Sequence, residues 1–151
     1  MNIMDNRTIL SGTYRKLILP PFFLIAILYF ARFTGATQIR IEGTAEFISP
    51  ALFFSAGLFS IIIPLVYRLA FIGRVRHRKK LERGEFIKFE KTTIYIASIS
   101  AYILFAACLY DIYKIHLAGT ALFVFYAVYY YYPSKTRIFT EERIFRVDTK
   151  R

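Results

Sequence analysis

The chain has 151 residues, of which 56% are hydrophobic and 19% aromatic, and its mean hydropathy of +0.42 lies above the usual range of soluble domains. Its formal charge is +11, and its single cysteine, Cys108, excludes an internal disulfide framework and a CxxC metal motif. The composition therefore favours a membrane protein, and the uncharged runs of sequence indicate where its spans lie.

Four uncharged runs are candidates for membrane-spanning helices: residues 17–31, 47–67, 92–110 and 117–134. A helix needs about 20 apolar residues, within a range of roughly 17 to 25, to cross a bilayer. The first run is shorter, but Lys16 and Arg32 at its flanks can extend to the headgroups. We therefore predict an all-α membrane protein with four transmembrane helices in an up-down-up-down bundle, with spans at about 17–33, 47–68, 92–110 and 116–132 of a single domain, 1–151.

The first run has an alternative interpretation as a cleaved signal peptide. Arg15 and Lys16 precede it, and the residues TGA at 34–36 offer a small-residue cleavage site. Because the sequence starts at Met1, we expect a retained span instead.

The distribution of Lys and Arg predicts the orientation of the spans. Residues 1–16, the loop 73–91 and the tail 133–151 carry three, eight and six cations, whereas the two segments on the other side carry only Arg40 and Lys114. Cytoplasmic loops of membrane proteins are enriched in Lys and Arg. The sequence thus predicts that both termini and the 73–91 loop are cytoplasmic, in a bacterial cytoplasmic membrane.

The same cations are candidates for contacts with anionic lipid or with a partner protein, since each basic residue beside a membrane helix attracts anionic headgroups. The residues predicted to make these contacts are Arg74, Arg76, Arg78, Lys79, Lys80, Arg83, Lys135, Arg137 and Arg143. Plain orientation of the chain is the simplest alternative role. Nucleic-acid binding is not predicted, because a basic run alone is a weak motif. Gly84 is expected to interrupt any helix through this loop.

Small residues at four-residue spacing predict close packing between the spans. The predicted packing residues are Ala51, Ser55, Ala56, Gly57 and Ser60 in the second span and Ala97 and Ala101 in the third. Pro20 and Pro21 are expected to bend or delay the first helix, and Pro64 to kink the second. The short connector 111–116 predicts a hairpin of the third and fourth spans.

A run of tyrosines ends the fourth span, and tyrosine is enriched where a helix meets the membrane surface. The predicted interfacial belt consists of Tyr126, Tyr129, Tyr130, Tyr131 and Tyr132. The alternative is an aromatic, lipid or quinone ligand stacked on these rings.

The search for chemistry predicts no catalytic residues, no metal site and no cofactor. Charged and titratable candidates lie only at span edges, namely Arg32, Glu46, Arg68, Asp111 and His116. His77 and His116 are predicted on opposite sides of the membrane, so one haem cannot use both. No hydrolase or phosphate-binding motif is present.

The tail after Pro133 is predicted to be a basic, aromatic interaction arm, with Glu141 and Glu142 on a solvated face. The function predicted from these features is a non-catalytic accessory or assembly subunit of a larger membrane complex, whose partners are membrane lipids and other membrane subunits or further copies of itself. One alternative is an oligomeric transporter or channel, with Ser55, Ser60, Ser98 and Ser100 along a neutral path and Pro64 at a gate. Another is a redox or lipid enzyme subunit.

Overall fold

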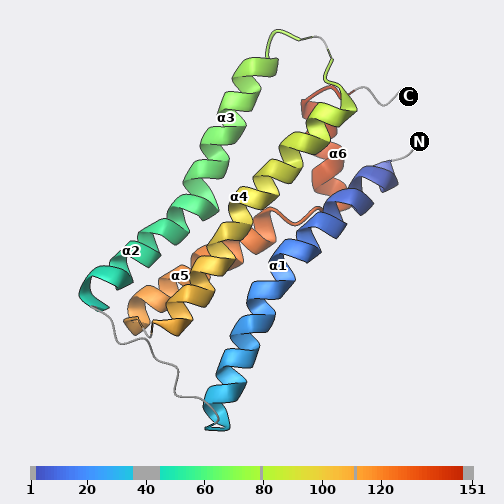
Figure 1. Ribbon diagram of the computed structural model, residues 1–151. Coiled ribbons are helices and arrows are strands. Elements are labelled where there is room, and N and C mark those ends of the chain that lie inside the picture. The colour runs from blue at the N-terminus through green and yellow to red at the C-terminus, as the bar shows by residue number, and fades with distance from the viewer. Residues whose placement is uncertain (1–2, 36–44, 79, 111, 148–151) are drawn as a thin grey trace.

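A computed structural model describes residues 3–35, 45–78, 80–110 and 112–147, and these residues are helical throughout their main elements (Figure 1). The elements are α1 (Ile3–Phe33), α2 (Ala45–Gly57), the π-helical turn η1 (Leu58–Ile62), α3 (Ile63–Val75), α4 (Arg83–Leu109), α5 (Lys114–Tyr130) and α6 (Lys135–Ile144). Within these ranges there is no β-strand, only an isolated parallel bridge between Leu81 and Val147. The prediction of an all-α protein is confirmed.

Three helical segments are long and apolar enough to cross a membrane: Asn6–Phe33, Glu46–Val75 and Arg83–Leu109. They correspond to the first three predicted spans, and each helix extends further than its uncharged run. The fourth predicted span coincides with α5, which has only 17 residues. At 1.5 Å per residue α5 is about 26 Å long, slightly less than the hydrocarbon core of a typical bilayer.

Helix α1 runs without interruption through Pro20 and Pro21, and it begins at Ile3 rather than near residue 17. The expected delay of this helix is therefore wrong. Each proline removes one backbone donor, but membrane helices tolerate this loss where neighbouring groups pack closely, and Pro21 is fully buried. The helix ends at Phe33, and Gly35, two residues later, has a φ of 69°, the left-handed conformation that glycine adopts readily after a helix.

Pro64 lies directly after the π-helical turn that joins α2 to α3. Ile63 donates its N–H to the Leu58 carbonyl, five residues earlier, which is the π-helical spacing. Pro64 lacks the N–H that an α-helix would use to bond the Ser60 carbonyl. The wider π-helical turn lies where this hydrogen bond is missing. The predicted irregularity of this span takes the form of a π-turn.

Helix α4 is the central element, because half of its most apolar window is buried inside the protein, against 17% for the first candidate span and 22% for the second. It begins at Arg83 and includes Gly84 in its first turn, so the expected interruption at Gly84 is wrong. Glycine is tolerated there because the first turn has few helical hydrogen bonds to lose. Phe86 and Phe89 on this first part of α4 are buried in a core cluster with Leu10, Ile138 and Phe145.

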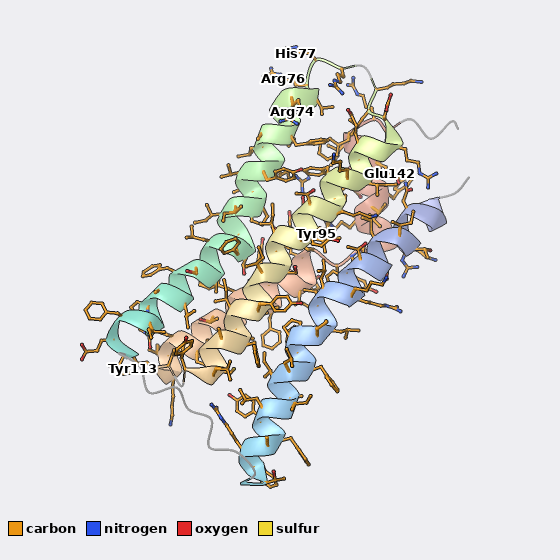
Figure 2. All side chains as sticks on the ribbon, viewed as in Figure 1. Arg74, Arg76, His77, Tyr95, Tyr113 and Glu142 are labelled. Carbon is orange, nitrogen blue, oxygen red and sulfur yellow. The ribbon has the colours of Figure 1, made fainter. Side chains whose placement is uncertain are left out.

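The two ends of the bundle are joined differently. At one end, the Arg32 guanidinium donates to the Cys108 carbonyl at 3.0 Å, and the Tyr113 N–H donates to the Ser49 hydroxyl at 3.2 Å. At the other end lie the start of α1, the connection between α3 and α4, and α6 (Figure 1). We call this second end the basic end, because Arg74, Arg76 and His77 gather there, far from Tyr113 (Figure 2).

Candidate functional site

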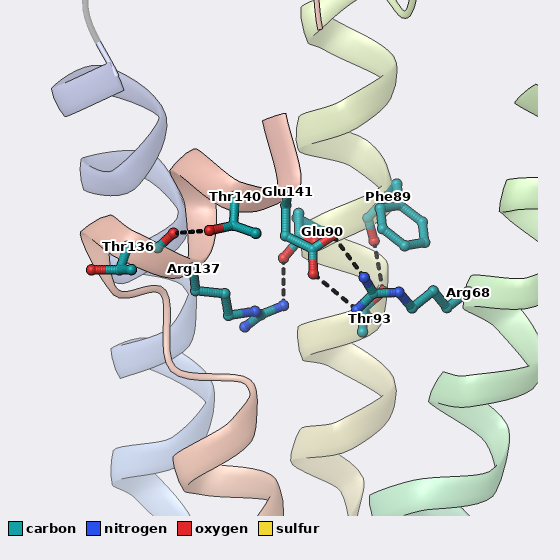
Figure 3. A network of polar contacts seen from close by, with 8 residues as sticks. All are labelled: Arg68, Phe89, Glu90, Thr93, Thr136, Arg137, Thr140 and Glu141. Carbon is teal, nitrogen blue, oxygen red and sulfur yellow. Dashed lines mark hydrogen bonds and ion pairs between the residues drawn. The ribbon is translucent and has the colours of Figure 1, made fainter. Parts of the chain in front are cut away.

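Four buried or half-buried charged side chains form an ionic cluster at the basic end: Arg68 on α3, Glu90 on α4, and Arg137 and Glu141 on α6 (Figure 3). Arg137 Nη2 donates to Glu90 Oε2 at 2.7 Å, and Glu90 is only 3% exposed. Arg68 binds Glu141 with both terminal nitrogens, at 2.8 and 3.0 Å. Separating the two partners of such a pair would leave uncompensated buried charges, which is unfavourable. Because the two pairs join α6 to α3 and α4, the cluster fixes α6 against these helices.

The geometry of α6 places Arg137 for this contact. Ser134 caps the helix, since its hydroxyl accepts a hydrogen bond from the Arg137 N–H at 3.1 Å. The Arg137 guanidinium also lies 5.7 Å from the centre of the Tyr131 ring, within the range of a cation–π contact. The Ser134 cap thus fixes the backbone of Arg137, while the Tyr131 ring and the Glu90 carboxylate hold its guanidinium.

A second buried polar group joins α6 to the beginning of the chain. Asn6 Nδ2 donates to Glu142 Oε1 at 2.7 Å, and Asn6 Oδ1 accepts from Arg83 Nε at 2.6 Å. Asn6 therefore bridges an acid of α6 and a base of α4 within a buried site, with both ends of its amide satisfied. Through Asn6, the first helix, the start of α4 and the last helix share one hydrogen-bond network.

The segment after α6 is bonded to the connection that precedes α4. The Leu81 N–H donates to the Arg146 carbonyl at 3.3 Å, beside the bridge between Leu81 and Val147. Arg146 has a φ of 49°, and Val147 donates to the Glu142 carbonyl at 3.0 Å, which is the pattern of a left-handed helix cap. Leu81 is fully buried, so this connection is packed against the bundle.

The tail is therefore a docked helix in the structure, and two predictions about it require correction. Glu141 and Glu142, expected on a solvated face, are buried and paired with Arg68 and Asn6. Ile138 is 1% exposed, so α6 packs on its own bundle through the face that was predicted to be free. Ile138, Glu141 and Glu142 have the i, i+3, i+4 spacing of residues on one helical face. Sequence reasoning missed this signal of a packed face.

The predicted cationic contact residues divide into two groups. Arg137 lies in the internal ion pair with Glu90, and Arg83 bonds to Asn6, so these two residues help to hold the fold. Arg78 pairs with Glu85 at 2.9 Å in an exposed position. The remaining described members are exposed at the surface of the basic end: Arg74, Arg76, Lys80, Lys135 and Arg143. Lys79 lies outside the described residues.

The tyrosine run also divides. Tyr126, Tyr129, Tyr130 and Tyr132 are exposed on the outside of the bundle, and the rings of Tyr126 and Tyr130 stack with centres 5.4 Å apart. Tyr131 instead points inward and packs with Ala97 and Ala127. Four of the five predicted belt residues therefore face outward.

The predicted small packing residues are mostly at helix contacts. Ala56, Ser60, Ala97 and Ala101 are buried, and a Cβ added at Gly57 would lie 3.3 Å from the Phe123 ring of α5. Ser55 is half-buried. Ala51 is exposed.

Of the predicted edge charges, Arg68 belongs to the ionic cluster and Arg32 bonds to the end of α4, while Asp111 lies outside the described residues. Glu46 and His116 lie on α2 and α5, near the opposite end. Glu90 and Asn6 were missed. Glu90 shares a buried helical face with Phe86, Phe89, Thr93 and Ala97, and a charge at that spacing on an apolar face is a readable signal of a buried ion pair.

Among the described residues, no group of three or more His, Cys, Asp or Glu side chains could hold a metal ion. Comparisons of this chain with protein family models, with curated proteins and with solved structures gave no match.

Proposed function

We propose that the chain is a single integral membrane domain of a bacterial cytoplasmic membrane and acts as a non-catalytic accessory or assembly subunit of a larger membrane complex. In this proposal α5 forms a fourth span, and both termini and the basic end face the cytoplasm. The excess of Lys and Arg on the segments that meet at this end supports the orientation.

The observation that carries the proposal is the docking of α6 onto α1, α3 and α4 through buried polar contacts. This docking makes α6 and the start of α4 parts of a fixed surface rather than free arms. Binding to a fixed surface loses less conformational entropy, so a preorganised basic end suits stable contact with a subunit or with anionic headgroups.

The first test is native mass spectrometry of the tagged full-length protein, extracted at natural abundance in a mild detergent. The proposal expects a heteromeric mass of constant stoichiometry. Replacement of the exposed Arg74, Arg76, Lys135 and Arg143 by Gln should reduce the heteromer and binding to phosphatidylglycerol vesicles. A matched variant that exchanges Arg and Lys at these positions keeps the charge and should behave as the parent. A monomer or a homo-oligomer alone would contradict the subunit role.

A transporter formed by oligomerisation is the second candidate, and the π-helical turn favours it, since such turns occur frequently at functional sites. The buried Ser60 hydroxyl in this turn has no hydrogen-bond partner among the described residues. Ser98 and Ser100 do not support a neutral path, because their hydroxyls donate to the Tyr95 and Ala97 carbonyls of their own helix. Solute flux in proteoliposomes that is lost in Ser60→Ala would favour this candidate over the first.

A further inference from the structure

A cavity of about 100 Å³ is lined by residues of η1, α3, α4, α5 and α6, among them members of the ionic cluster. Ile61, Pro64 and Leu65 give it an apolar side. Its polar lining residues include Glu90, Thr93 and Arg137. The cavity therefore has an apolar side and a polar base, which is the arrangement that accepts one end of an amphiphilic molecule.

Three residues that line the cavity are exposed on the outer face of the bundle. Leu65 is 51% exposed, and Tyr126 and Tyr130 on the α5 side are also exposed on that face. These residues lie on helices that carry exposed apolar side chains along their length. A ligand would thus reach the cavity from the hydrocarbon phase, with its polar end first.

The cavity lining includes the side chain of Arg137, one nitrogen of which has no acceptor among the described residues. Arg137 Nη2 donates to Glu90, whereas Arg137 Nη1 is buried and has no acceptor among the described residues. A buried guanidinium N–H without an acceptor is unfavourable, so an oxygen atom supplied within the cavity would stabilise it. The Thr93 hydroxyl donates to the Phe89 carbonyl at 3.0 Å, and Arg137 Nη1 makes no hydrogen bond to it.

The charges around Arg137 Nη1 determine whether an anionic or a neutral oxygen is the better acceptor. Both arginines of the cluster already have a carboxylate partner, and the Glu90 carboxylate itself lines the cavity. A phosphate would add a negative charge beside Glu90 in a poorly solvated place, and no unpaired cation offsets that charge. A neutral acceptor would satisfy the N–H without this cost.

We propose that this cavity binds the carbonyl oxygen of a neutral membrane amphiphile, with Arg137 Nη1 as the donor and the stacked Tyr126 and Tyr130 rings beside the ligand. The carbonyl could belong to a quinone ring or to the ester of a diacylglycerol, and the tail of either would remain in the lipid. This inference goes beyond the proposed subunit role and does not depend on it.

The test is a native mass spectrometry titration of the full-length protein in mild detergent with three separate probes: decylbenzoquinone, dioleoylglycerol and phosphatidylglycerol. Saturable binding of one neutral probe per chain is expected, and the probe that binds identifies the ring or the ester as the source of the carbonyl. Tighter saturable binding of phosphatidylglycerol at this cavity, or no saturable binding of a neutral probe, would overturn the proposal.

Two variants locate the binding. Leu65→Trp places a larger side chain in the cavity lining and leaves the residues of the ionic cluster unchanged, so it should weaken binding about tenfold. Leu69→Trp, at an exposed position one turn further along α3 that does not line the cavity, should change binding less than about twofold. Equal effects of the two tryptophans would place the ligand elsewhere.

Arg137→Lys supplies the second check. It retains a positive charge for Glu90 but replaces the planar fork by one ammonium group, and so removes the second donor. We expect about tenfold weaker binding of the neutral probe. Unchanged affinity in this variant would show that Nη1 is not the donor and would overturn the assignment.

Discussion

Glu90 and Arg137 show how a charged pair can reside inside a chain as apolar as this one. The carboxylate is nearly inaccessible, and its partner is held by a capped helix start and by the Tyr131 ring. Either charge alone would be strongly unfavourable at this depth, so the two residues depend on each other.

Replacement of Glu90 by Gln tests this dependence. The variant should lose about 3 kcal/mol of stability, because the Arg137 guanidinium keeps its charge and loses its counter-charge in a buried site. Thermal unfolding in detergent, followed by circular dichroism, measures the loss. The double variant Glu90→Gln with Arg137→Gln should recover part of the stability. A double variant less stable than the single one would contradict the pairing.

Arg146 adopts a left-handed backbone conformation, which costs a non-glycine residue about 1–2 kcal/mol. Arg146→Gly should therefore raise the unfolding temperature. The matched change at the exposed Arg143, inside the last turn of α6, should lower the stability by about 1 kcal/mol, because glycine is a poor helix former. The opposite signs of the two changes distinguish the backbone effect from a loss of charge. Destabilisation by both would contradict the left-handed conformation.

At the scale of the elements, glycines on α2 and α5 lie against aromatic rings of the other helix. A Cβ added at Gly119 would collide with the Phe53 ring of α2, whereas one added at Gly12 on α1 would meet nothing within 4 Å. The position of α5, the shortest candidate span, thus depends on a residue without a side chain.

Gly119→Leu should force α5 away from α2 and destabilise the bundle by about 1–3 kcal/mol. Gly12→Leu, the same change in an exposed stretch of α1, should be neutral or slightly stabilising, because leucine favours the helix more than glycine does. Thermal unfolding of both variants in one detergent gives the comparison. An equal effect of the two changes would argue against the close contact of α2 and α5.

The helices themselves could be predicted from the sequence, because uncharged runs of sufficient length have few other stable forms. The ends of the helices at the basic side could not be predicted, because Asn6, Arg83 and Glu90 are polar and join the packed helices only through partners distant in the sequence. The docking of α6 was missed for the same reason, since Glu141 and Glu142 look solvated until Arg68 and Asn6 are placed beside them. At Pro20 and Pro21 the sequence predicted a disturbed helix where the structure has a continuous one, because local propensity gives way to the packing of a long helix.

At the scale of the whole molecule, large apolar side chains remain exposed along the helices, among them Phe23, Phe30, Phe54, Leu122 and Phe125. A soluble protein rarely presents so many. In a bilayer these side chains would contact lipid, and the exposed arginines and lysines at the basic end would lie in the headgroup region.

Cysteine labelling tests the orientation. In a Cys108→Ala background, single cysteines at His77 and Tyr113 lie at opposite ends of the bundle (Figure 2), and both positions are exposed. In intact cells a membrane-impermeant maleimide should label position 113 and spare position 77, and permeabilisation should expose the latter. Labelling of position 77 in intact cells would invert the proposed topology.

The order of the helices along the chain also has a consequence for biosynthesis. Asn6, Arg68 and Glu90 are all synthesised before Glu142, Glu141 and Arg137, with which they pair. While the ribosome is still translating the earlier helices, these three side chains lack those partners, and α6 supplies all of them when it emerges. Closure of this end therefore cannot precede the synthesis of α6. A polypeptide halted before residue 135 would retain an uncompensated arginine and glutamate, a difference by which membrane proteases can separate abortive products from finished ones.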